Sequence, residues 1–253
     1  MSTQQVHGIH VVQALLTAHP KRVQQIRLLA DRKDQRIAEI EALARKFRVP
    51  VERLSKRPFE QLAGNVRHQG VIAVCVPLEP MSEPEMLGKL ASMDKPALVL
   101  ILDGITDPHN LGAILRSADA AGVNCVIAGR DGSVGLTPAV RKVASGAAEN
   151  VPFCAVANLK RTMAELKSLG IWLYGAAGDG TQSYTAIDYR GAAGLVLGAE
   201  GKGLRRLTRD ACDELVHIPM TGTVSSLNVS VAAGVFMFEA VRQRSIATID
   251  IKN

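Results

Sequence analysis

The sequence predicts an α/β protein built from two parts, and three observations lead to this fold class. First, apolar runs that suit buried strands alternate with stretches of helical spacing over most of residues 96–242, and such alternation favours a mostly parallel sheet. Second, a proline-rich segment interrupts the chain near residue 80. Third, the excess positive charge lies before that segment. The length of 253 residues also suits two domains better than one.

Residues 1–77 are predicted to form a small α/β domain. The helix expected at 35–47 carries apolar residues at intervals of three and four, and Pro50 lies just beyond its end. Val and Ile are frequent in the strand expected at 70–76. The other elements expected here are helices at 7–17 and 58–63 and strands at 23–29 and 51–54.

The segment that follows the small domain is predicted to be a linker. Pro77, Pro80 and Pro84 punctuate an acidic stretch, a composition typical of an interdomain connection. Together with a short helix, this linker is expected to span residues 78–95.

Residues 96–253 are predicted to form the larger α/β domain. The run 97–102 is continuously apolar, which is typical of a strand buried on both faces. Proline in the first turn favours a helix at 138–145. The remaining strands are expected at 125–128, 151–156, 171–176, 192–197 and 214–218, and the remaining helices at 110–121, 159–169, 204–209 and 229–242. Residues 245–253 are expected to be a loose tail.

Composition excludes several classes of protein. The sequence contains no apolar run of about 18 residues or more, so no transmembrane helix is expected. The first residues lack the pattern of a signal peptide, and a cytoplasmic location is the expectation. The cysteines, Cys75, Cys125, Cys154 and Cys212, are far apart and form no CxxC pair. Reduced thiols explain them better than disulfides or zinc ligands, and no metal is expected.

The distribution of charge suggests a nucleic-acid partner. Residues 1–80 contain 13 Lys and Arg against 7 Asp and Glu, whereas the rest of the chain contains 17 of each kind. A basic block beside a neutral block is typical of a nucleic-acid-binding module joined to another domain, although a merely soluble basic domain has the same composition. Aromatic residues make up only 4% of the chain, so phosphate contacts are expected rather than base stacking.

Three loops that follow predicted strands contain the candidate functional residues, as open α/β sheets bind ligands at such loops. The first, at 102–118, contains Asn110 near a helix start and Arg116 inside an otherwise apolar helix. Asn110 alone would be explained as a helix cap, and Arg116 as a salt-bridged surface residue.

The second loop, at 195–204, has glycines that permit close approach of a ligand. Its spacing matches neither GxGxxG nor a P-loop, and Glu200 alone would be explained as a cap of the next helix. The third loop, at 218–230, gathers Ser, Thr and Asn before the last helix. This pattern suits a capping region, but it also offers backbone groups that could bind an adenine edge.

Together the three loops resemble the motifs of the SpoU family of RNA ribose methyltransferases, in the knotted SPOUT superfamily. The matching patterns are N-x-G-x-x-x-R-S-A at 110–118, L-x-x-G-x-E-x-x-G at 195–203 and I-P-M-x-G-x-x-x-S-L-N-V-S at 218–230. The resemblance extends over residues 97–242. Segments 6–15 and 68–72 also resemble the family's substrate-binding domain, which is similar to the L30e/L7Ae-like ribosomal protein fold.

The resemblance implies a knotted fold, a methyl donor and a partner. A trefoil knot is expected in the catalytic domain at 96–253, and a homodimer is expected to form through that domain. The donor implied is S-adenosylmethionine, bound through backbone groups in loops that contain Gly198, Ile218 and Leu227. The two-part architecture is most similar to the branch that methylates the 2′-hydroxyl of a guanosine in 23S rRNA, at the P loop of the peptidyl-transferase centre.

The resemblance also implies a set of catalytic residues: Asn110, Arg116, Glu200, Ser226 and Asn228. Arg116 is expected to act on the 2′-hydroxyl, either as a base or as an electrostatic stabiliser, and Glu200 to fix its guanidinium. Asn110 and Asn228 would orient these groups, with assistance from Ser226. A tRNA ribose methyltransferase and a catalytically inactive RNA-binding or ribosome assembly factor are the alternatives.

Overall fold

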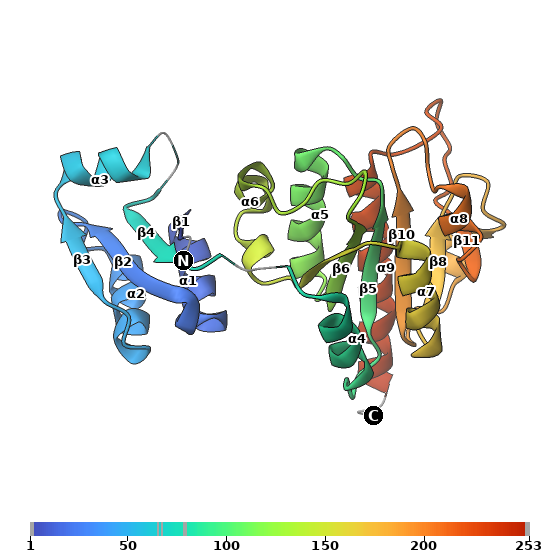
Figure 1. Cartoon of the computed structure of the whole chain (residues 1–253), viewed down its shortest axis with the longest axis horizontal. Helices are drawn as coiled ribbons and strands as arrows, with labels where there is room; N and C mark the ends of the chain where they lie inside the picture. Colours follow the sequence, from blue (N-terminus) through green and yellow to red (C-terminus); the bar gives the residue numbers. More distant parts are fainter. Residues whose placement is uncertain (1–2, 65, 67, 78–79, 251–253) are drawn as a thin grey trace. The chain divides into compact units, whose positions relative to one another are not determined.

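The computed structural model describes residues 3–64, 66, 68–77 and 80–250. The chain divides into two compact units, Met1–Glu79 and Pro80–Asn253 (Figure 1). Two residues of the predicted linker, 78 and 79, lie outside the described residues, as do 251–253 at the end of the chain.

The first unit contains a mixed sheet of four strands in the order β1-β4-β2-β3. The central strand β4 is antiparallel to both β1 and β2, whereas β2 and β3 are parallel. The strands are β1 (Gln4–His7), β2 (Val23–Leu29), β3 (Val51–Leu54) and β4 (Val71–Cys75). The helices are α1 (Ile9–Ala18), α2 (Gln35–Lys46) and α3 (Lys56–Ala63), with a 3₁₀ turn at Pro20–Arg22.

Successive residues of β4 supply both cores of this unit, because side chains alternate between the faces of a strand. Val71 and Ala73 pack with α1 and α2, whereas Ile72 packs with Phe59 of α3 on the other face. Strand β1 was not predicted, because residues 4–7 show no apolar alternation and the helix was expected to begin at residue 7. Gly8 separates the two elements with a φ of 97°, in a region that favours glycine.

The second unit contains a sheet of seven strands in the order β7-β6-β5-β10-β8-β11-β9, and every pair of neighbours is parallel. The strands are β5 (Leu98–Asp103), β6 (Cys125–Gly129), β7 (Phe153–Val156), β8 (Trp172–Ala176), β9 (Gln182–Ser183), β10 (Ala193–Gly198) and β11 (Glu214–His217). The helices are α4 (Glu83–Ala91), α5 (Pro108–Ala120), α6 (Pro138–Ala144), α7 (Leu159–Ser168), α8 (Arg206–Arg209) and α9 (Val229–Asp250). Short 3₁₀ turns lie at Ala147–Glu149 and Tyr184–Ala186.

Helices cover both faces of this sheet, which explains the continuous apolar run of β5. Leu100 and Leu102 pack with α5, α6 and α9 on one face, whereas Val99 and Ile101 pack with α4 and α7 on the other. The predicted α/β fold with a mostly parallel sheet is therefore confirmed. Figure 1 shows α4 and α7 in front of the strands and α9 passing behind them.

The helix expected within the linker is part of the second unit. Met86 and Leu90 of α4 are buried against the core that contains Val99 and Met163. The backbone N–H of Met81 donates to the carbonyl of Phe153 at 2.8 Å, so the second unit incorporates the chain from residue 81 onward.

The prediction of a loose tail from residue 245 was wrong, because α9 continues to Asp250. Arg244 anchors this helix: its guanidinium donates to the carbonyls of Tyr189 (2.9 Å), Pro96 (3.0 Å), Ala97 (3.0 Å) and Gly191 (2.7 Å). Such contacts join segments far apart in the sequence, which local patterning does not reveal.

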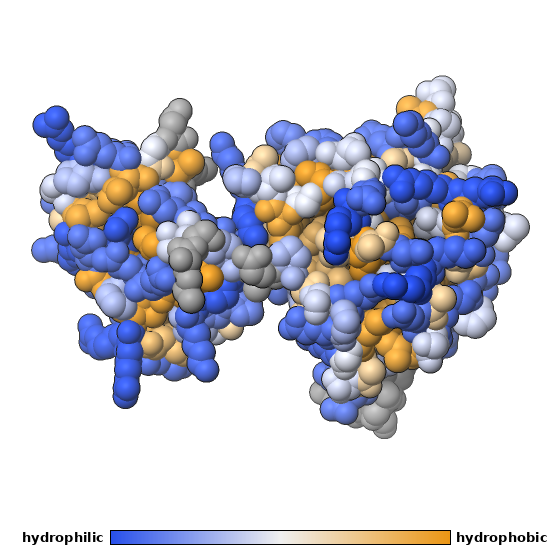
Figure 2. All heavy atoms as spheres, in the orientation of Figure 1, coloured by the Kyte–Doolittle hydropathy of each residue, from blue (hydrophilic) through white to orange (hydrophobic). Residues whose placement is uncertain are grey.

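Figure 2 shows hydrophilic and apolar residues intermixed on the visible face of each unit. Among the described residues, no helix combines the length and the apolar character needed to cross a membrane.

We predict that Arg244→Ala lowers the stability of the second unit by about 2 kcal/mol, because a charged donor is lost to several carbonyls at once. Thermal unfolding of the full chain would measure the change. Arg190→Ala is the matched control, since Arg190 pairs with the exposed Asp188, and it should leave the midpoint nearly unchanged. Equal midpoints for both variants would contradict the anchoring role.

Candidate active site

The register of the central strands brings the first two motif loops together. Gly198, the last residue of β10, pairs with Asp103, the last residue of β5. The loops that follow therefore leave the sheet side by side at its carboxyl edge. Open α/β sheets bind ligands at this edge, where the direction of strand order changes.

Asn110 lies in the first turn of α5 but does not cap it. The helix begins at Pro108, and the carboxylate of Asp107 accepts the backbone N–H of His109 at 2.9 Å as the cap. Asn110 is 9% exposed, and its Nδ2 donates to Oε2 of Glu200 at 3.2 Å. The explanation of Asn110 as a plain helix cap is therefore wrong.

Asn228 combines a structural contact with a contact to the first two motif loops. Its Oδ1 accepts the backbone N–H of Ser230 at 2.9 Å, as the cap of α9. Its Nδ2 donates to Oδ1 of Asn110 at 3.0 Å and lies 3.4 and 3.5 Å from the oxygens of Glu200. These three residues form the Asn110–Glu200–Asn228 cluster, which joins one residue from each motif loop.

Arg116 and Ser226 do not join this cluster. Arg116 follows Asn110 by six residues, which places it roughly 9 Å along the helix axis and about 120° around it. Its side chain is exposed. Glu200 contacts the two asparagine amides. No hydrogen bond or ion pair joins it to the guanidinium of Arg116 among the described residues, so the role of Glu200 in holding Arg116 stays a prediction. Ser226 lies exposed in the third loop.

Gly198 occupies a position that excludes any side chain. A Cβ there would lie 2.1 Å from the backbone carbonyl carbon of Gly203. The close approach arises because the chain turns back on itself after β10, and the N–H of Gly203 donates to the carbonyl of Ala199 at 2.8 Å. Gly201 and Gly203 have φ values of 73° and 66°, which favour glycine.

Ile218 and Leu227 stand at the two ends of an exposed loop. Both are partly buried, whereas residues 219–226 are exposed. No backbone hydrogen bond links residues 219–226 to another residue that the structure describes. Backbone N–H and C=O groups of this loop are therefore available to a ligand, which fits the mode of donor binding that the sequence implies.

A cavity of about 320 Å³ opens beside the cluster. Asn110 and Glu200 line it, together with Asp103, Lys202 and Arg205, which were not among the candidate catalytic or donor-binding residues. The available sequence signal for Asp103 was its place directly after the continuous apolar run 97–102. Nothing local distinguished Arg205 from the neighbouring arginines.

The cysteines lie outside this site, and none of the four takes part in a disulfide. Burial raises the pKa of Cys125 to about 12 and that of Cys154 to about 11. Thiols with such pKa values stay protonated at neutral pH and are poor nucleophiles. Over the described ranges, no group of three or more His, Cys, Asp or Glu side chains is arranged to hold a metal ion.

We predict that Gly198→Ala destabilises the second unit by roughly 1–3 kcal/mol, because the added methyl group would overlap backbone that cannot move independently. Gly178→Ala is the matched control, since a Cβ there has no neighbour within 4 Å. Chemical denaturation of both variants would compare the free energies of unfolding. An unchanged value for Gly198→Ala would show that the turn opens at little cost.

Comparison with known proteins assigns both units. Residues 97–238 match the model of the SpoU rRNA methylase family, and residues 5–81 match that of the RNA 2′-O ribose methyltransferase substrate-binding domain. A protein of Pseudomonas putida named 23S rRNA (guanosine-2′-O-)-methyltransferase RlmB is 51% identical over 96% of this chain and 98% of its own. The protein of the same name from Escherichia coli K12 is 47% identical over 96% of this chain and 100% of its own.

A solved structure agrees with these matches. The SpoU methyltransferase AviRb from Streptomyces viridochromogenes superposes with a TM-score of 0.76 at 25% identity, covering 97% of this chain and 91% of AviRb. The two matched models cover both units, and the motif loops that the SpoU pattern identified meet at one edge of the sheet. The chain belongs to the SpoU rRNA methylase family.

Proposed function

We propose that the protein transfers the methyl group of S-adenosylmethionine to the ribose 2′-hydroxyl of a guanosine in 23S rRNA. The observation that carries this proposal is the Asn110–Glu200–Asn228 cluster, which gathers the three motif loops beside a cavity. Relatives 47–51% identical over nearly the whole chain bear the name of this activity, which supports the choice of substrate.

Two loops of the second unit suit the donor. The turn that follows Gly198 and the loop between Ile218 and Leu227 would hold it through backbone groups. Glycines at 198, 201 and 203 allow close approach to the main chain of the turn, and residues 219–226 are exposed, uncharged and make no backbone hydrogen bond to a described residue. S-adenosylmethionine supplies a methyl group already activated by its sulfonium, so the remaining work of the protein is to position the acceptor hydroxyl and assist loss of its proton.

In the transfer, the bond from methyl carbon to sulfur breaks and S-adenosylhomocysteine leaves, the bond from methyl carbon to the ribose 2′-oxygen forms, and the hydroxyl proton passes to solvent water. We assign Arg116 to stabilise the negative charge that develops on the oxygen, because a guanidinium keeps its protons in proteins. Asn110 and Asn228 orient the carboxylate of Glu200 through their amide donors, and Ser226 assists from the exposed loop.

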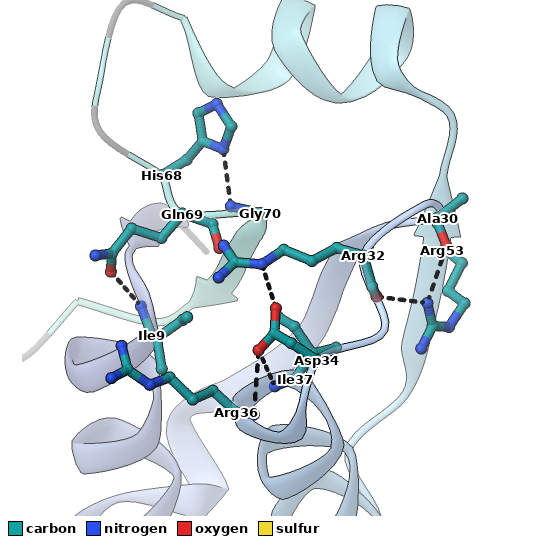
Figure 3. Close-up of polar contacts among 10 residues, drawn as sticks. All are labelled: Ile9, Ala30, Arg32, Asp34, Arg36, Ile37, Arg53, His68, Gln69 and Gly70. Carbon is teal, nitrogen blue, oxygen red and sulfur yellow. Dashed lines mark hydrogen bonds and ion pairs between the residues drawn. The ribbon is translucent and has the colours of Figure 1, made fainter.

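The first unit supplies most of the RNA affinity in this proposal. Arg32 and Arg53 hold its loops in place: Arg32 donates to Asp34 and to the carbonyl of Gln69, and Arg53 donates to the carbonyls of Ala30 and Arg32 (Figure 3). Beside them a wide cavity of about 600 Å³ is lined by His10, Gln13, Arg32, Asp34, Gln35, Arg36 and Glu39. Arg36 in this lining and the neighbouring Lys33 are exposed basic side chains, which suit phosphate groups.

The remaining parts of the proposal are a homodimer, a knot and a location. Val231, Phe238 and Ile246 of α9 are 52%, 48% and 46% exposed, and an apolar stripe of this kind is typical of a surface that another subunit covers. A trefoil knot in the second unit is proposed because the chain returns after β11 to α5, where Asn228 contacts Asn110. A ribosomal RNA substrate implies a cytoplasmic location.

Methyl transfer to purified RNA tests the proposal directly. The full chain would be incubated with labelled S-adenosylmethionine and either unmodified 23S rRNA or unmodified tRNA. We expect 2′-O-methylguanosine in 23S rRNA, located by ribose-methylation mapping. Label in tRNA alone would support the tRNA branch instead. Donor and RNA binding without transfer would support an inactive assembly factor.

We predict that Arg116→Ala abolishes methyl transfer but leaves the fold and donor binding nearly intact, because Arg116 is exposed and lies outside the donor loops. Single-turnover transfer and binding of S-adenosylhomocysteine would be measured on the same preparation. Arg190→Ala, which removes an exposed arginine elsewhere in the unit, is the control. Near-normal transfer by Arg116→Ala would remove Arg116 from the mechanism.

The basic side chains of the first unit should determine the salt dependence of RNA binding. We predict that Lys33→Gln combined with Arg36→Gln makes the plot of log affinity against log salt less steep. The magnitude of its negative slope should fall by roughly 1–2 units, since each phosphate contact contributes about 0.7–0.9. Lys89→Gln combined with Lys95→Gln removes equal charge from the second unit and should change the slope less. A larger change in slope for the Lys89 and Lys95 variant than for the Lys33 and Arg36 variant would locate the main RNA contacts in the second unit.

A further inference from the structure

A buried carboxylate fixes Arg205 at the mouth of the cavity beside the Asn110–Glu200–Asn228 cluster. Asp103 is the last residue of the central strand β5 and is only 2% exposed. Its Oδ2 accepts the backbone N–H of Arg205 at 2.9 Å, and its Oδ1 lies 3.6 Å from the Nε of the same residue. One carboxylate thus holds both the main chain and the side chain of Arg205.

Two glycines leave space for the guanidinium of Arg205. A Cβ on Gly104 would lie 3.2 Å from its Nη2, and a Cβ on Gly132 would lie 2.8 Å from the same atom. Both glycines have positive φ, at 83° and 73°. Gly104 lies in the loop that follows β5, and Gly132 lies in the loop that follows β6. A residue with a side chain at either position would push the guanidinium of Arg205 out of its present place.

The terminal nitrogens of Arg205 remain available for a ligand. The side chain is 61% exposed, and within the part of the chain that the structure describes no hydrogen bond uses Nη1 or Nη2. Arg205 lines the same cavity as Asn110 and Glu200, whereas Arg116 is not among the residues that line it. A planar guanidinium with free N–H groups binds a phosphate through two parallel hydrogen bonds.

We propose that Arg205 binds the phosphodiester on the 3′ side of the ribose that receives the methyl group, and so positions the acceptor. This inference rests on the proposed function. In any RNA that phosphate is attached to O3′, on the carbon next to the one that carries the reacting 2′-oxygen. A cation that shares a cavity with the cluster is therefore placed to hold this phosphate while the 2′-oxygen reacts.

The test compares two RNAs that differ in one phosphate. The substrate is an RNA stem-loop that contains the acceptor guanosine located by ribose-methylation mapping. It is assembled from two strands with a nick directly after this guanosine, so that the upstream strand ends either in a 3′-phosphate or in a 3′-hydroxyl. We expect kcat/KM of the unsubstituted protein to fall about tenfold or more without the phosphate, as expected for loss of a charged hydrogen-bonded pair. Arg205→Gln should show the lower value on both RNAs, and Arg205→Lys should recover part of the difference.

Controls separate this role from a structural one. Arg205→Gln should retain the thermal midpoint and the affinity for S-adenosylhomocysteine. Arg209→Gln removes an arginine of α8 that pairs with Asp179 away from the cavity, and it should keep the full preference for the 3′-phosphate. If a nicked RNA is bound but not methylated, Kd values measured with S-adenosylhomocysteine present give the same comparison.

The outcomes distinguish the two proposals. If Arg205→Gln keeps the preference for the 3′-phosphate, or if the unsubstituted protein has none, the role of Arg205 is overturned while the proposed function stands. If intact 23S rRNA receives no methyl group from the unsubstituted protein, the proposed function itself fails.

Discussion

The pairing of β5 with β10 is the constraint on which the candidate site depends. Six residue pairs in parallel register bring Asp103 and Gly198 level at the carboxyl edge of the sheet. A shift of one residue would turn the apolar side chains of β5 toward the wrong helices, because successive residues face opposite cores. The two buried cores thus fix the register, and the register fixes where Asn110 and Glu200 meet.

Much of this arrangement could be predicted from the sequence, and the errors have physical causes. The doubly buried strands and the helices α2 and α5 carry their periodicity in their own residues. Strand β1 and the end of α9 do not, since the pairing with β4 and the contacts of Arg244 depend on distant segments. The motif patterns predicted the cluster residues, but only the structure showed that Glu200 contacts two amides.

The two arginines proposed to act on the acceptor differ in how strongly the surrounding residues constrain them. Arg116 is exposed on α5. Arg205 contacts the carboxylate of Asp103, and its guanidinium lies beside two glycines that leave space for it. A fixed guanidinium loses little conformational freedom when it binds an anion, which suits recognition. A less constrained one suits a group that engages only when the acceptor arrives.

The Arg244 anchor has a consequence for how the chain folds during synthesis. Its contacts with Pro96 and Ala97 span 148 and 147 residues, so the second unit closes on its own beginning. The core of the first unit contains only residues that precede the second unit in the sequence. Domains generally fold as units while the chain emerges during synthesis. The first unit can therefore be complete before α9 completes the second unit.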